Sequence, residues 1–288
     1  MKGIILAAGD GKRLYPLTSA YNKQLLPIYD KPMVYYPLTT LIENGIRDVC
    51  LIVKPHQVDS FKEVLGDGSR FGISITYMTQ KVPRGIAEAF IIAEKFINKS
   101  HVMLVLGDNL WHGATVFKKA VKGFKSGATI FGYRVSDPER YGVIEFNEQG
   151  KAISIEEKPK NPKSNYAIPG LYVFDSKVVE ISTALKPSVR GELEITDAIE
   201  VYLKLGELHV EKVNRGCAWL DAGTTAAFYE SAAYVQALER RQGIKIGCPE
   251  EAAFNKGFLS EAELIDVIRD TPESEYRVYL TSLLEGDK

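Results

Sequence analysis

The segment Gly3-Ile4-Ile5-Leu6-Ala7-Ala8-Gly9-Asp10-Gly11-Lys12-Arg13-Leu14 decides the fold. Its first six residues form a continuous apolar run of strand length, which is typical of a strand buried on both faces of a parallel sheet. Gly9 and Gly11 then allow positive φ and a close approach of the backbone to a ligand. Lys12 and Arg13 follow at once, so backbone N–H groups and two cations share one loop at the ligand end of a strand. This combination suits a polyphosphate, although an ordinary glycine-rich turn fits the loop equally well.

The loop matches neither of two familiar phosphate-binding motifs. The P-loop spacing GxxxxGK[ST] is absent from it. In the dinucleotide fingerprint GxGxxG, the third glycine would fall at Leu14. A polyphosphate ligand here therefore requires a different class of site.

Around this loop, the N-terminal half alternates between two periodicities. Short apolar runs predict strands at Gly3–Ala8, Val49–Val53, Ile73–Met78 and Val102–Leu106. Amphipathic stretches between them predict helices at Met33–Glu43, Val58–Leu65, Gly85–Phe96 and Thr115–Phe124. The alternation predicts an α/β fold in which helices cover both faces of a parallel sheet.

From residue 128 onward the pattern changes. Strands are predicted at Ala128–Arg134, Val143–Phe146, Ala152–Glu157, Ala167–Phe174 and Glu207–Val213, and a helix from an N-cap at Thr196 to about Gly206. Further helices are predicted at Ala226–Arg241, Glu261–Ile268 and Ser274–Leu284. No linker rich in Ser, Pro or Gly separates these regions. We expect one Rossmann-like domain with a mixed, mostly parallel sheet over residues 1–225. A helical extension over residues 226–288 would pack on that domain or on a neighbouring subunit.

Composition and charge exclude several classes of protein. The 288 residues are 45% hydrophobic and 25% charged, close to a typical soluble protein, and the formal charge of −1 gives no footprint for nucleic acid or an anionic membrane. The three cysteines and four histidines show no disulfide or metal-binding spacing. No apolar run is long enough for a membrane span or a signal peptide core. We expect a cytoplasmic protein without nucleic-acid or membrane partners.

Further motifs follow the glycine-rich loop along the chain. They are Asn22-Lys23-Gln24-Leu25-Leu26-Pro27, Gly107-Asp108-Asn109, Glu156-Glu157-Lys158-Pro159, Arg190-Gly191-Glu192-Leu193-Glu194-Ile195-Thr196-Asp197 and Trp219-Leu220-Asp221-Ala222-Gly223. With the GxGxRL pattern of the loop, they resemble the signature of the sugar-phosphate nucleotidyltransferases from residue 3 to about 225. The resemblance implies an enzyme that joins a nucleoside triphosphate to a sugar 1-phosphate and releases pyrophosphate. It points to members that use dTTP and glucose 1-phosphate in the first step of dTDP-rhamnose synthesis.

The chemistry of this reaction places demands on charge. The attacking phosphate is largely dianionic at pH 7, so it needs no general base, but it must approach a polyanion. Arg13 suits the triphosphate, because a guanidinium binds phosphate bidentately. The resemblance implies catalytic roles for Arg13, Lys23, Asp108 and Lys158 and a Mg²⁺ site at Asp108 and Asp221. It implies nucleotide contacts from Leu6, Gly9, Gly11, Lys12, Arg13, Lys23, Gln24, Gln80, Gly85 and Asp108.

Glu157 is singled out by its place on a predicted strand. Ile153, Ile155 and Glu157 share one face of that strand by the period of two. A carboxylate on an apolar face needs either an internal cation or a ligand hydroxyl. The resemblance implies that Glu157 binds sugar hydroxyls and that Lys158 binds the sugar phosphate. It adds sugar contacts from Asn109, Tyr141, Gly142, Arg190 and Glu192.

Base selection falls to Gln80 in this resemblance, because an amide can match O4 and N3–H of thymine or uracil. Gly85 is expected to open the following helix beside the nucleotide. Two residues depart from the family pattern: Ala8 replaces a glycine, and Arg84, which we expect to be solvated, replaces a smaller or acidic residue. A UTP-using or broad-specificity enzyme stays open, because one amide separates thymine from uracil poorly. A catalytically silent subunit that binds nucleotide sugars is the alternative from another class.

The C-terminal helices carry no chemistry that the sequence reveals. In the family this region helps to form a tetramer and a second nucleotide-sugar site, so the resemblance implies a homotetramer and feedback by dTDP-rhamnose. Cys217 stands in Arg215-Gly216-Cys217-Ala218, where an aromatic residue is usual. Feedback is therefore a hypothesis only.

Overall fold

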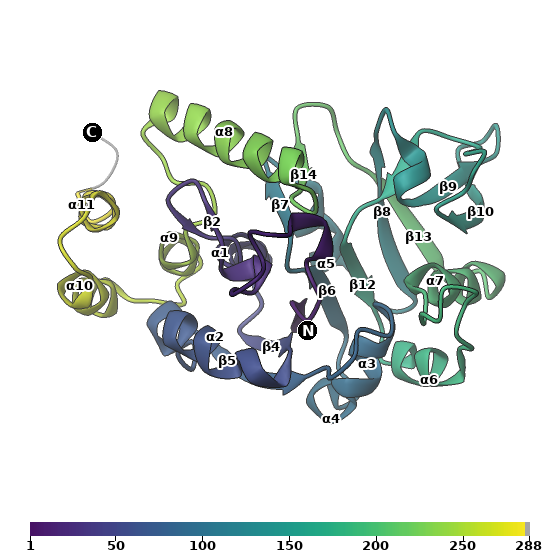
Figure 1. The fold of residues 1–288 in the computed structure, drawn as a ribbon, viewed down its shortest axis with the longest axis horizontal. Helices are drawn as coiled ribbons and strands as arrows, with labels where there is room; N and C mark the ends of the chain where they lie inside the picture. The colour runs from purple at the N-terminus through teal and green to yellow at the C-terminus, as the bar shows by residue number, and fades with distance from the viewer. Residues whose placement is uncertain (286–288) are drawn as a thin grey trace.

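A ten-stranded sheet forms the centre of the molecule in the computed structural model, which describes residues 1–285 (Figure 1). Nine strands follow one another across the sheet, and β13 (Leu208–Lys212) pairs with β8 outside that path. In order they are β10 (Ala152–Glu157), β9 (Gly142–Phe146), β11 (Tyr166–Ile168), β8 (Ala128–Arg134), β12 (Leu171–Phe174), β6 (Val102–Leu106), β1 (Lys2–Leu6), β4 (Asp48–Val53) and β5 (Ser74–Thr79).

Most strands of this sheet point the same way. β1, β4, β5, β6, β8, β9 and β13 run in one direction, and β10, β11 and β12 run against them. The parallel side, β6-β1-β4-β5, comes from the N-terminal half, where the sequence alternates strand with helix. The predicted mixed, mostly parallel sheet is confirmed.

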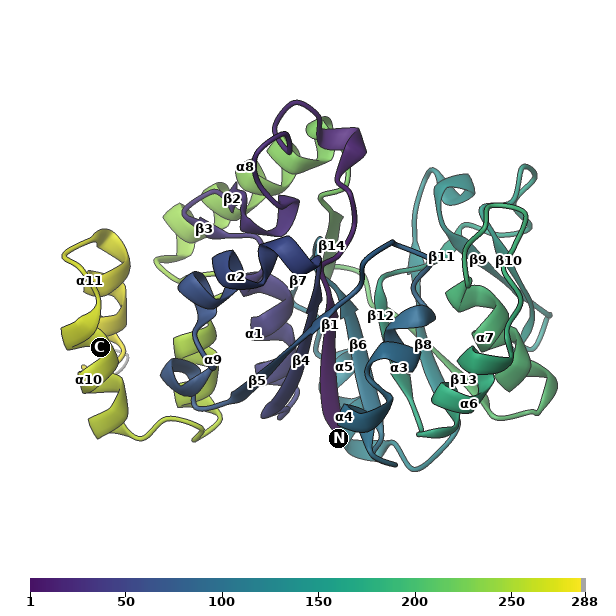
Figure 2. The same cartoon turned by 60° about the horizontal axis from the view of Figure 1, so that its bottom comes forward.

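Helices cover both faces of the sheet (Figure 2). Ile5 belongs to a core with α1 (Tyr35–Glu43), α2 (Val58–Leu65), α5 (Val116–Gly123) and α9 (Pro249–Asn255). Its neighbour Ile4 belongs to the opposite core with α3 (Glu88–Ile92), α4 (Glu94–Ile97), α6 (Lys177–Ala184) and α7 (Ile195–Lys204). Successive residues of a strand face opposite sides of the sheet. Both side chains are buried, because helices cover each side. The apolar run of the first strand is thus explained by burial on both faces.

Some predicted boundaries were wrong for identifiable reasons. The strand expected at Ala167–Phe174 is two strands, β11 and β12, because Pro169 and Gly170 interrupt the ladder. The helix expected at Gly85–Phe96 begins at Glu88 and is divided into α3 and α4. Thr196 is not the N-cap of α7; Glu194, whose backbone is still extended, holds that position.

A β-bulge changes the predicted face of β10. The register between β10 and β9 shifts between Ala152 and Ser154. Ile153 is therefore turned outward and is 50% exposed, whereas Ile155 packs against the core. The prediction that Ile153 shares the apolar face with Ile155 and Glu157 was wrong, because a bulge breaks the period of two.

Short elements escaped the sequence analysis. β7 (Asn109–His112) pairs with β14 (Ala218–Asp221), and β2 (Pro27–Ile28) pairs with β3 (Lys31–Pro32). Runs of two to four residues carry too little periodicity to be recognised. α6 and α9 were also missed.

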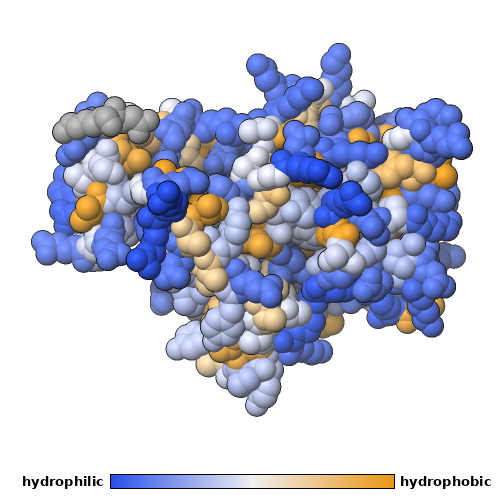
Figure 3. Space-filling view, turned by 90° about the horizontal axis from the view of Figure 1, so that it is seen from above, coloured by the Kyte–Doolittle hydropathy of each residue, from blue (hydrophilic) through white to orange (hydrophobic). Residues whose placement is uncertain are grey.

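The C-terminal helices lie beside the sheet. α8 (Thr225–Gln242) follows an N-cap at Thr224 and packs on β14 and β2, and α9 packs on α1. α10 (Glu261–Asp270) and α11 (Glu275–Ser282) share a small apolar cluster around Leu264 and Leu280, at the end of the molecule far from β10 (Figure 2). Hydrophobic side chains on the face in Figure 3 form small separate groups. Among residues 1–285, no helix has both the length and the apolar character needed to cross a membrane.

Candidate functional site

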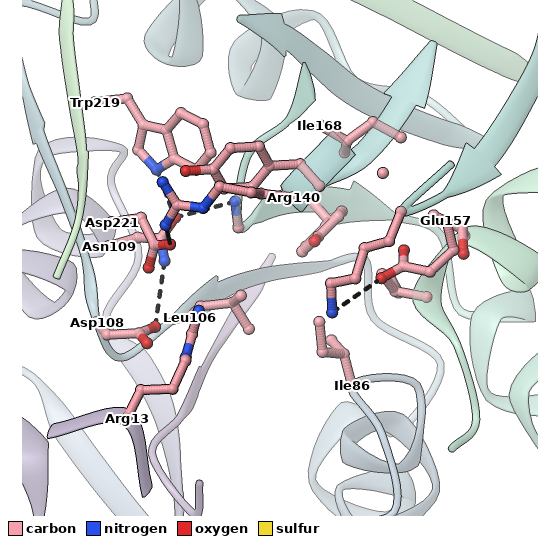
Figure 4. A pocket seen from close by; sticks show the side chains of 17 residues that line it. Arg13, Ile86, Leu106, Asp108, Asn109, Arg140, Glu157, Ile168, Trp219 and Asp221 are labelled. Carbon is pink, nitrogen blue, oxygen red and sulfur yellow. Dashed lines mark hydrogen bonds and ion pairs between the residues drawn. The ribbon is translucent and has the colours of Figure 1, made fainter. Parts of the chain in front are cut away.

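Strand pairing brings two carboxylates to one edge of the sheet. Asp108 follows β6 after Gly107, and β7 begins at the next residue. β7 pairs antiparallel with β14, which sets Asp221 opposite Asn109, and the N–H of Ala222 donates to the carbonyl oxygen of Asp108 at 3.0 Å. Figure 4 shows Asp108, Asn109 and Asp221 on the same side of a pocket. Residues far apart in sequence thus form one acidic edge.

Opposite influences act on the two carboxylates. Burial works to raise the pKa of Asp108, but the charge and hydrogen bond of Lys23 Nζ outweigh it and hold that pKa below its ordinary value. Burial and the charge of Asp108 raise the pKa of Asp221 to about 6, against the cations Arg13, Lys23 and Arg140. Repulsion between the two carboxylates therefore disfavours the charged form of Asp221 and not that of Asp108. Such a pair suits a hard divalent ion that also binds phosphate oxygens and water.

The glycine-rich loop brings Arg13 into the same pocket as these carboxylates (Figure 4). Gly11 has φ of 64°, and a short 3₁₀ turn, Lys12–Leu14, follows it. The Arg13 guanidinium lies against Gly223, where a Cβ would come within 2.6 Å of Nη2. Lys12 does not line the pocket; its side chain is 85% exposed and pairs with Asp10 at 3.2 Å. The loop therefore directs one of its two cations to the site.

Of two predicted nucleotide residues, Lys23 lies against this loop and Gln24 lies against Gly107. Lys23 Cε would be 3.9 Å from a Cβ at Gly9, so the lysine passes under the loop to reach Asp108. Gln24 is buried, and its Oε1 has no hydrogen-bond partner among the residues described. An unpaired buried acceptor is costly unless a ligand satisfies it. Leu6 ends β1 and packs in the core shared with α3.

The sugar-side residues lie across the pocket. Glu157 Oε1 is 3.2 Å from Arg190 Nη2 and 3.5 Å from Lys158 Nζ, so the carboxylate has internal cations as well as an open side (Figure 4). Lys158 adopts φ of 46°, an uncommon conformation for a residue other than glycine. A Cβ at Gly142 would lie 2.8 Å from Thr196 Cγ2, so the pocket wall needs glycine there. Of the predicted sugar-binding positions, Lys158 thus has a strained backbone and Gly142 is closely packed.

Arg190 and Glu192 belong to a network of ion pairs that includes the pocket residue Glu157. The guanidinium of Arg190 binds the carboxylate of Glu194 through Nε at 3.0 Å and Nη2 at 2.6 Å, and it is 3.3 Å from Glu192. Neither Arg190 nor Glu192 lines the pocket itself. Arg190 therefore reaches the site through Glu157.

Asn109 is occupied by structural hydrogen bonds. Its Oδ1 accepts from Trp219 Nε1 at 2.6 Å and from the N–H of Gly170 at 3.1 Å, and its Nδ2 donates to Asp108 at 3.2 Å. Trp219 in turn packs on Tyr141, with ring centroids 5.0 Å apart. Asn109 therefore fixes Asp108 and the aromatic wall from the same amide.

Sequence reasoning missed Arg140 and Thr196 among the residues of this pocket. Arg140 lies 3.9 Å from Asp221 and lines the cavity; its position next to Tyr141-Gly142 could have suggested it. Thr196 also lines the cavity, and its Oγ1 is buried without a hydrogen-bond partner in the described chain. Its motif was noticed, but it was interpreted as a helix cap.

Gln80 lies outside this pocket, at the end of β5. It is buried, and its Nε2 donates to Glu88 Oε2 at 2.7 Å. Arg84 is 68% exposed, as expected, but its guanidinium also binds Glu88, which the sequence analysis did not foresee. Gly85 has φ of 101°, and a Cβ there would lie 2.3 Å from the carbonyl oxygen of Leu193. Gly85 therefore allows two loops to touch and does not open α3.

Comparisons with known proteins agree with this geometry. Residues 2–237 match the family model described as nucleotidyl transferase. Glucose-1-phosphate thymidylyltransferases from Neisseria meningitidis and Mycobacterium tuberculosis are both 50% identical to this chain over 287 residues. These matches cover 99% of this chain and 100% and 99% of the relatives.

Solved structures give the same result. A crystal structure of a Bacillus anthracis protein, assigned as a glucose-1-phosphate thymidylyltransferase and bound to sucrose, matches with a TM-score of 0.76 at 42% identity, covering 81% of this chain and 94% of that one. A UDP-glucose pyrophosphorylase bound to UDP-glucose matches with a TM-score of 0.73 at 22% identity, covering 84% of this chain and 99% of that one, which shows the shared fold. A nucleoside triphosphate and a sugar phosphate are substrates that fit such enzymes, which generally use a divalent metal ion. The chain is an enzyme that belongs to the nucleotidyl transferase family, in the group of the glucose-1-phosphate thymidylyltransferases.

Proposed function

We propose that this enzyme transfers the thymidylyl group of dTTP to α-D-glucose 1-phosphate and releases pyrophosphate. The observation that carries the proposal is the agreement over the full chain with relatives of that name at 50% identity. The pocket supports it, because cations and acidic residues line one side and a carboxylate with its lysine lines the other. The product is dTDP-glucose, the starting point of dTDP-sugar synthesis, for which we propose dTDP-rhamnose as the destination.

The phosphate of the sugar acts as the nucleophile. It carries its own negative charge at pH 7 and attacks the α-phosphorus in line, opposite the departing pyrophosphate. Arg13 binds the triphosphate bidentately, and Lys23 adds a point charge where Asp108 holds it. These cations offset the repulsion between the two phosphates. Positioning and charge, and not proton transfer, supply the rate enhancement in this proposal.

Residues of the opposite wall hold the sugar. Glu157 accepts hydrogen bonds from hexose hydroxyls, and Lys158 binds the 1-phosphate. The absent side chain of Gly142 leaves room for the ring, since a Cβ would already crowd Thr196. Arg190 keeps Glu157 in place through its ion pair. The wall thus fixes both ends of the sugar phosphate.

We propose Mg²⁺ as the divalent ion, bound by Asp108 and Asp221. Oxygen donors are the ligands that this ion prefers, and it usually takes one or two carboxylates together with substrate phosphates. The raised pKa of Asp221 supports the proposal, because a second negative charge beside Asp108 stays unfavourable despite Arg13, Lys23 and Arg140, and a divalent ion would offset it. When bound, the ion neutralises charge on the phosphates.

The test is pyrophosphate release with glucose 1-phosphate, Mg²⁺ and one of dTTP, UTP, dCTP, ATP or GTP. We expect release with dTTP to exceed release with every other nucleotide. Equal rates with UTP would replace the proposal by a relaxed pyrimidine enzyme. A folded protein that releases no pyrophosphate with any nucleotide would refute it.

Three finer features belong to the same proposal. We propose a cytoplasmic enzyme, because its phosphorylated substrates are metabolites of that compartment, and a homotetramer with feedback by dTDP-rhamnose. Cys217 lines a cavity formed by residues 113–116 and 213–217, which shares no lining residue with the reaction pocket. Molecular mass in solution tests the tetramer, and an unchanged rate with dTDP-rhamnose present would exclude feedback.

A further inference from the structure

Glu88 holds the buried amide of Gln80 at one end. Gln80 follows β5 directly, and Glu88 is the first residue of α3. They are only 3% and 5% exposed. Gln80 Nε2 donates to Glu88 Oε2 at 2.7 Å, while Arg84 Nε donates to the other carboxylate oxygen at 2.9 Å. The sequence pointed to Gln80 alone, but in the structure Gln80 ends a hydrogen-bonded relay of three residues, Gln80, Glu88 and Arg84.

This relay fixes the orientation of the amide. A carboxylate accepts hydrogen bonds, so only the nitrogen end of Gln80 can face Glu88. If the amide turned over, its oxygen would meet Glu88 Oε2 at hydrogen-bond distance with no proton between them. Arg84 supplies the positive charge that a buried carboxylate requires. Donor and acceptor of Gln80 therefore lie in one fixed order.

The order of donor and acceptor is what distinguishes pyrimidine bases. Thymine and uracil carry a donor at N3–H beside an acceptor at O4, whereas cytosine carries an acceptor at N3 beside a donor at N4. An amide that pairs with thymine must turn over to pair with cytosine. A fixed amide can therefore accept one class and reject the other.

We propose that Glu88, charged against Arg84, is a positioning residue that makes the enzyme select bases with N3–H over cytosine. The inference rests on the dTTP binding of the proposed function, with the base placed against Gln80 as the family resemblance implies. Glu88 itself does not touch the nucleotide. Its effect passes through the orientation of one amide.

The test compares the affinities of the protein for dTTP and for dCTP in the presence of Mg²⁺, measured by titration calorimetry. We expect the wild type to bind dTTP more tightly. Glu88→Gln keeps the shape of the side chain but can both donate and accept, so either orientation of Gln80 is satisfied. The affinity ratio of dTTP to dCTP is expected to fall by about tenfold or more in this variant, equivalent to about 1.4 kcal/mol.

A matched control makes the same chemical change nearby. Glu94→Gln alters an exposed carboxylate on α4 and is expected to leave the ratio unchanged. Arg84→Met removes the cation without altering the buried side chains and is expected to lower the ratio by a smaller factor.

Several outcomes would overturn the inference. They are an unchanged ratio in folded Glu88→Gln protein, an unchanged ratio in Arg84→Met if the first variant does not fold, and equal affinity of the wild type for both nucleotides. Binding is measured without the sugar phosphate, so the two proposals fail separately. A protein that prefers dTTP but releases no pyrophosphate from glucose 1-phosphate would refute the proposed function and leave the role of Glu88 standing.

Discussion

Replacement of Asp221 by asparagine is expected to stabilise the protein in the absence of metal. The Asp221 side chain is only 16% exposed, and burial together with the charge of Asp108 raises its pKa from 3.8 to about 6. An acid whose pKa is raised by folding is destabilised in its charged form. The variant keeps the shape of the side chain and removes that charge.

The size and sign of the effect follow from the pKa. A shift of about two units corresponds to about 3 kcal/mol, at about 1.36 kcal/mol for each unit. The unfavourable term is fully present above the folded pKa of about 6 and disappears as the pH falls toward the unfolded value of 3.8. Asp221→Asn is therefore expected to raise the free energy of unfolding by about 3 kcal/mol at pH 8 and by about half of that at pH 5.

Urea unfolding with EDTA at both pH values measures this difference. Asp270→Asn serves as the control, because the Asp270 side chain is 77% exposed and its replacement is expected to change stability little at either pH. Added Mg²⁺ is expected to raise the stability of the wild type and not that of Asp221→Asn. A variant that is no more stable than the wild type at pH 8, or whose gain is the same at pH 5, would refute the proposed electrostatic conflict between Asp108 and Asp221.

Other predictions concern the nucleotide side of the pocket and the contact between the loops of Gly85 and Leu193. Asp108→Asn is expected to reduce pyrophosphate release by at least about 100-fold while the far-ultraviolet circular dichroism stays unchanged, and full activity would remove Asp108 from the site. Arg13→Ala is expected to lower kcat more than it raises KM for glucose 1-phosphate, whereas the reverse pattern would assign Arg13 to the sugar. Gly85→Ala is expected to lower the free energy of unfolding by about 2 kcal/mol or more, because a Cβ would lie 2.3 Å from the Leu193 carbonyl oxygen; a neutral effect in urea unfolding would refute the strain.

Long, strongly patterned elements were predictable from the sequence. The central strands carry apolar side chains on both faces, and α2 has clear helical spacing, so both were found with nearly correct bounds. Elements of two to four residues were not found, although the pairing of β7 with β14 is what brings Asp221 to Asp108. Such pairing depends on tertiary contacts that no local periodicity records.

Polar residues also differ in whether local sequence or tertiary contacts reveal their role. Asp108 follows an obvious strand, so its position at the sheet edge could be predicted. Glu88 could not be found this way, because it occupies an ordinary first turn of a helix and its importance depends on the hydrogen bond that it accepts from Gln80. Ile153 was misplaced because a bulge leaves no local sign in its neighbours. The sequence thus predicts where a strand ends more reliably than which side chains meet there.

The contact between the loops of Arg84 and Leu193 joins the two halves of the proposed site. The N–H of Leu193 donates to the carbonyl oxygen of Arg84 at 2.7 Å, and the N–H of Ala87 donates to the Leu193 carbonyl oxygen at 3.2 Å. On one side, Arg84 binds Glu88, which accepts a hydrogen bond from the Gln80 amide. On the other side, Leu193 precedes Glu194, whose carboxylate binds Arg190, and Arg190 pairs with Glu157. The proposed base and sugar sites are therefore joined by backbone hydrogen bonds and not only by the sheet. In-line attack requires the two substrates to be held in fixed relation, and a rigid link of this kind supplies it.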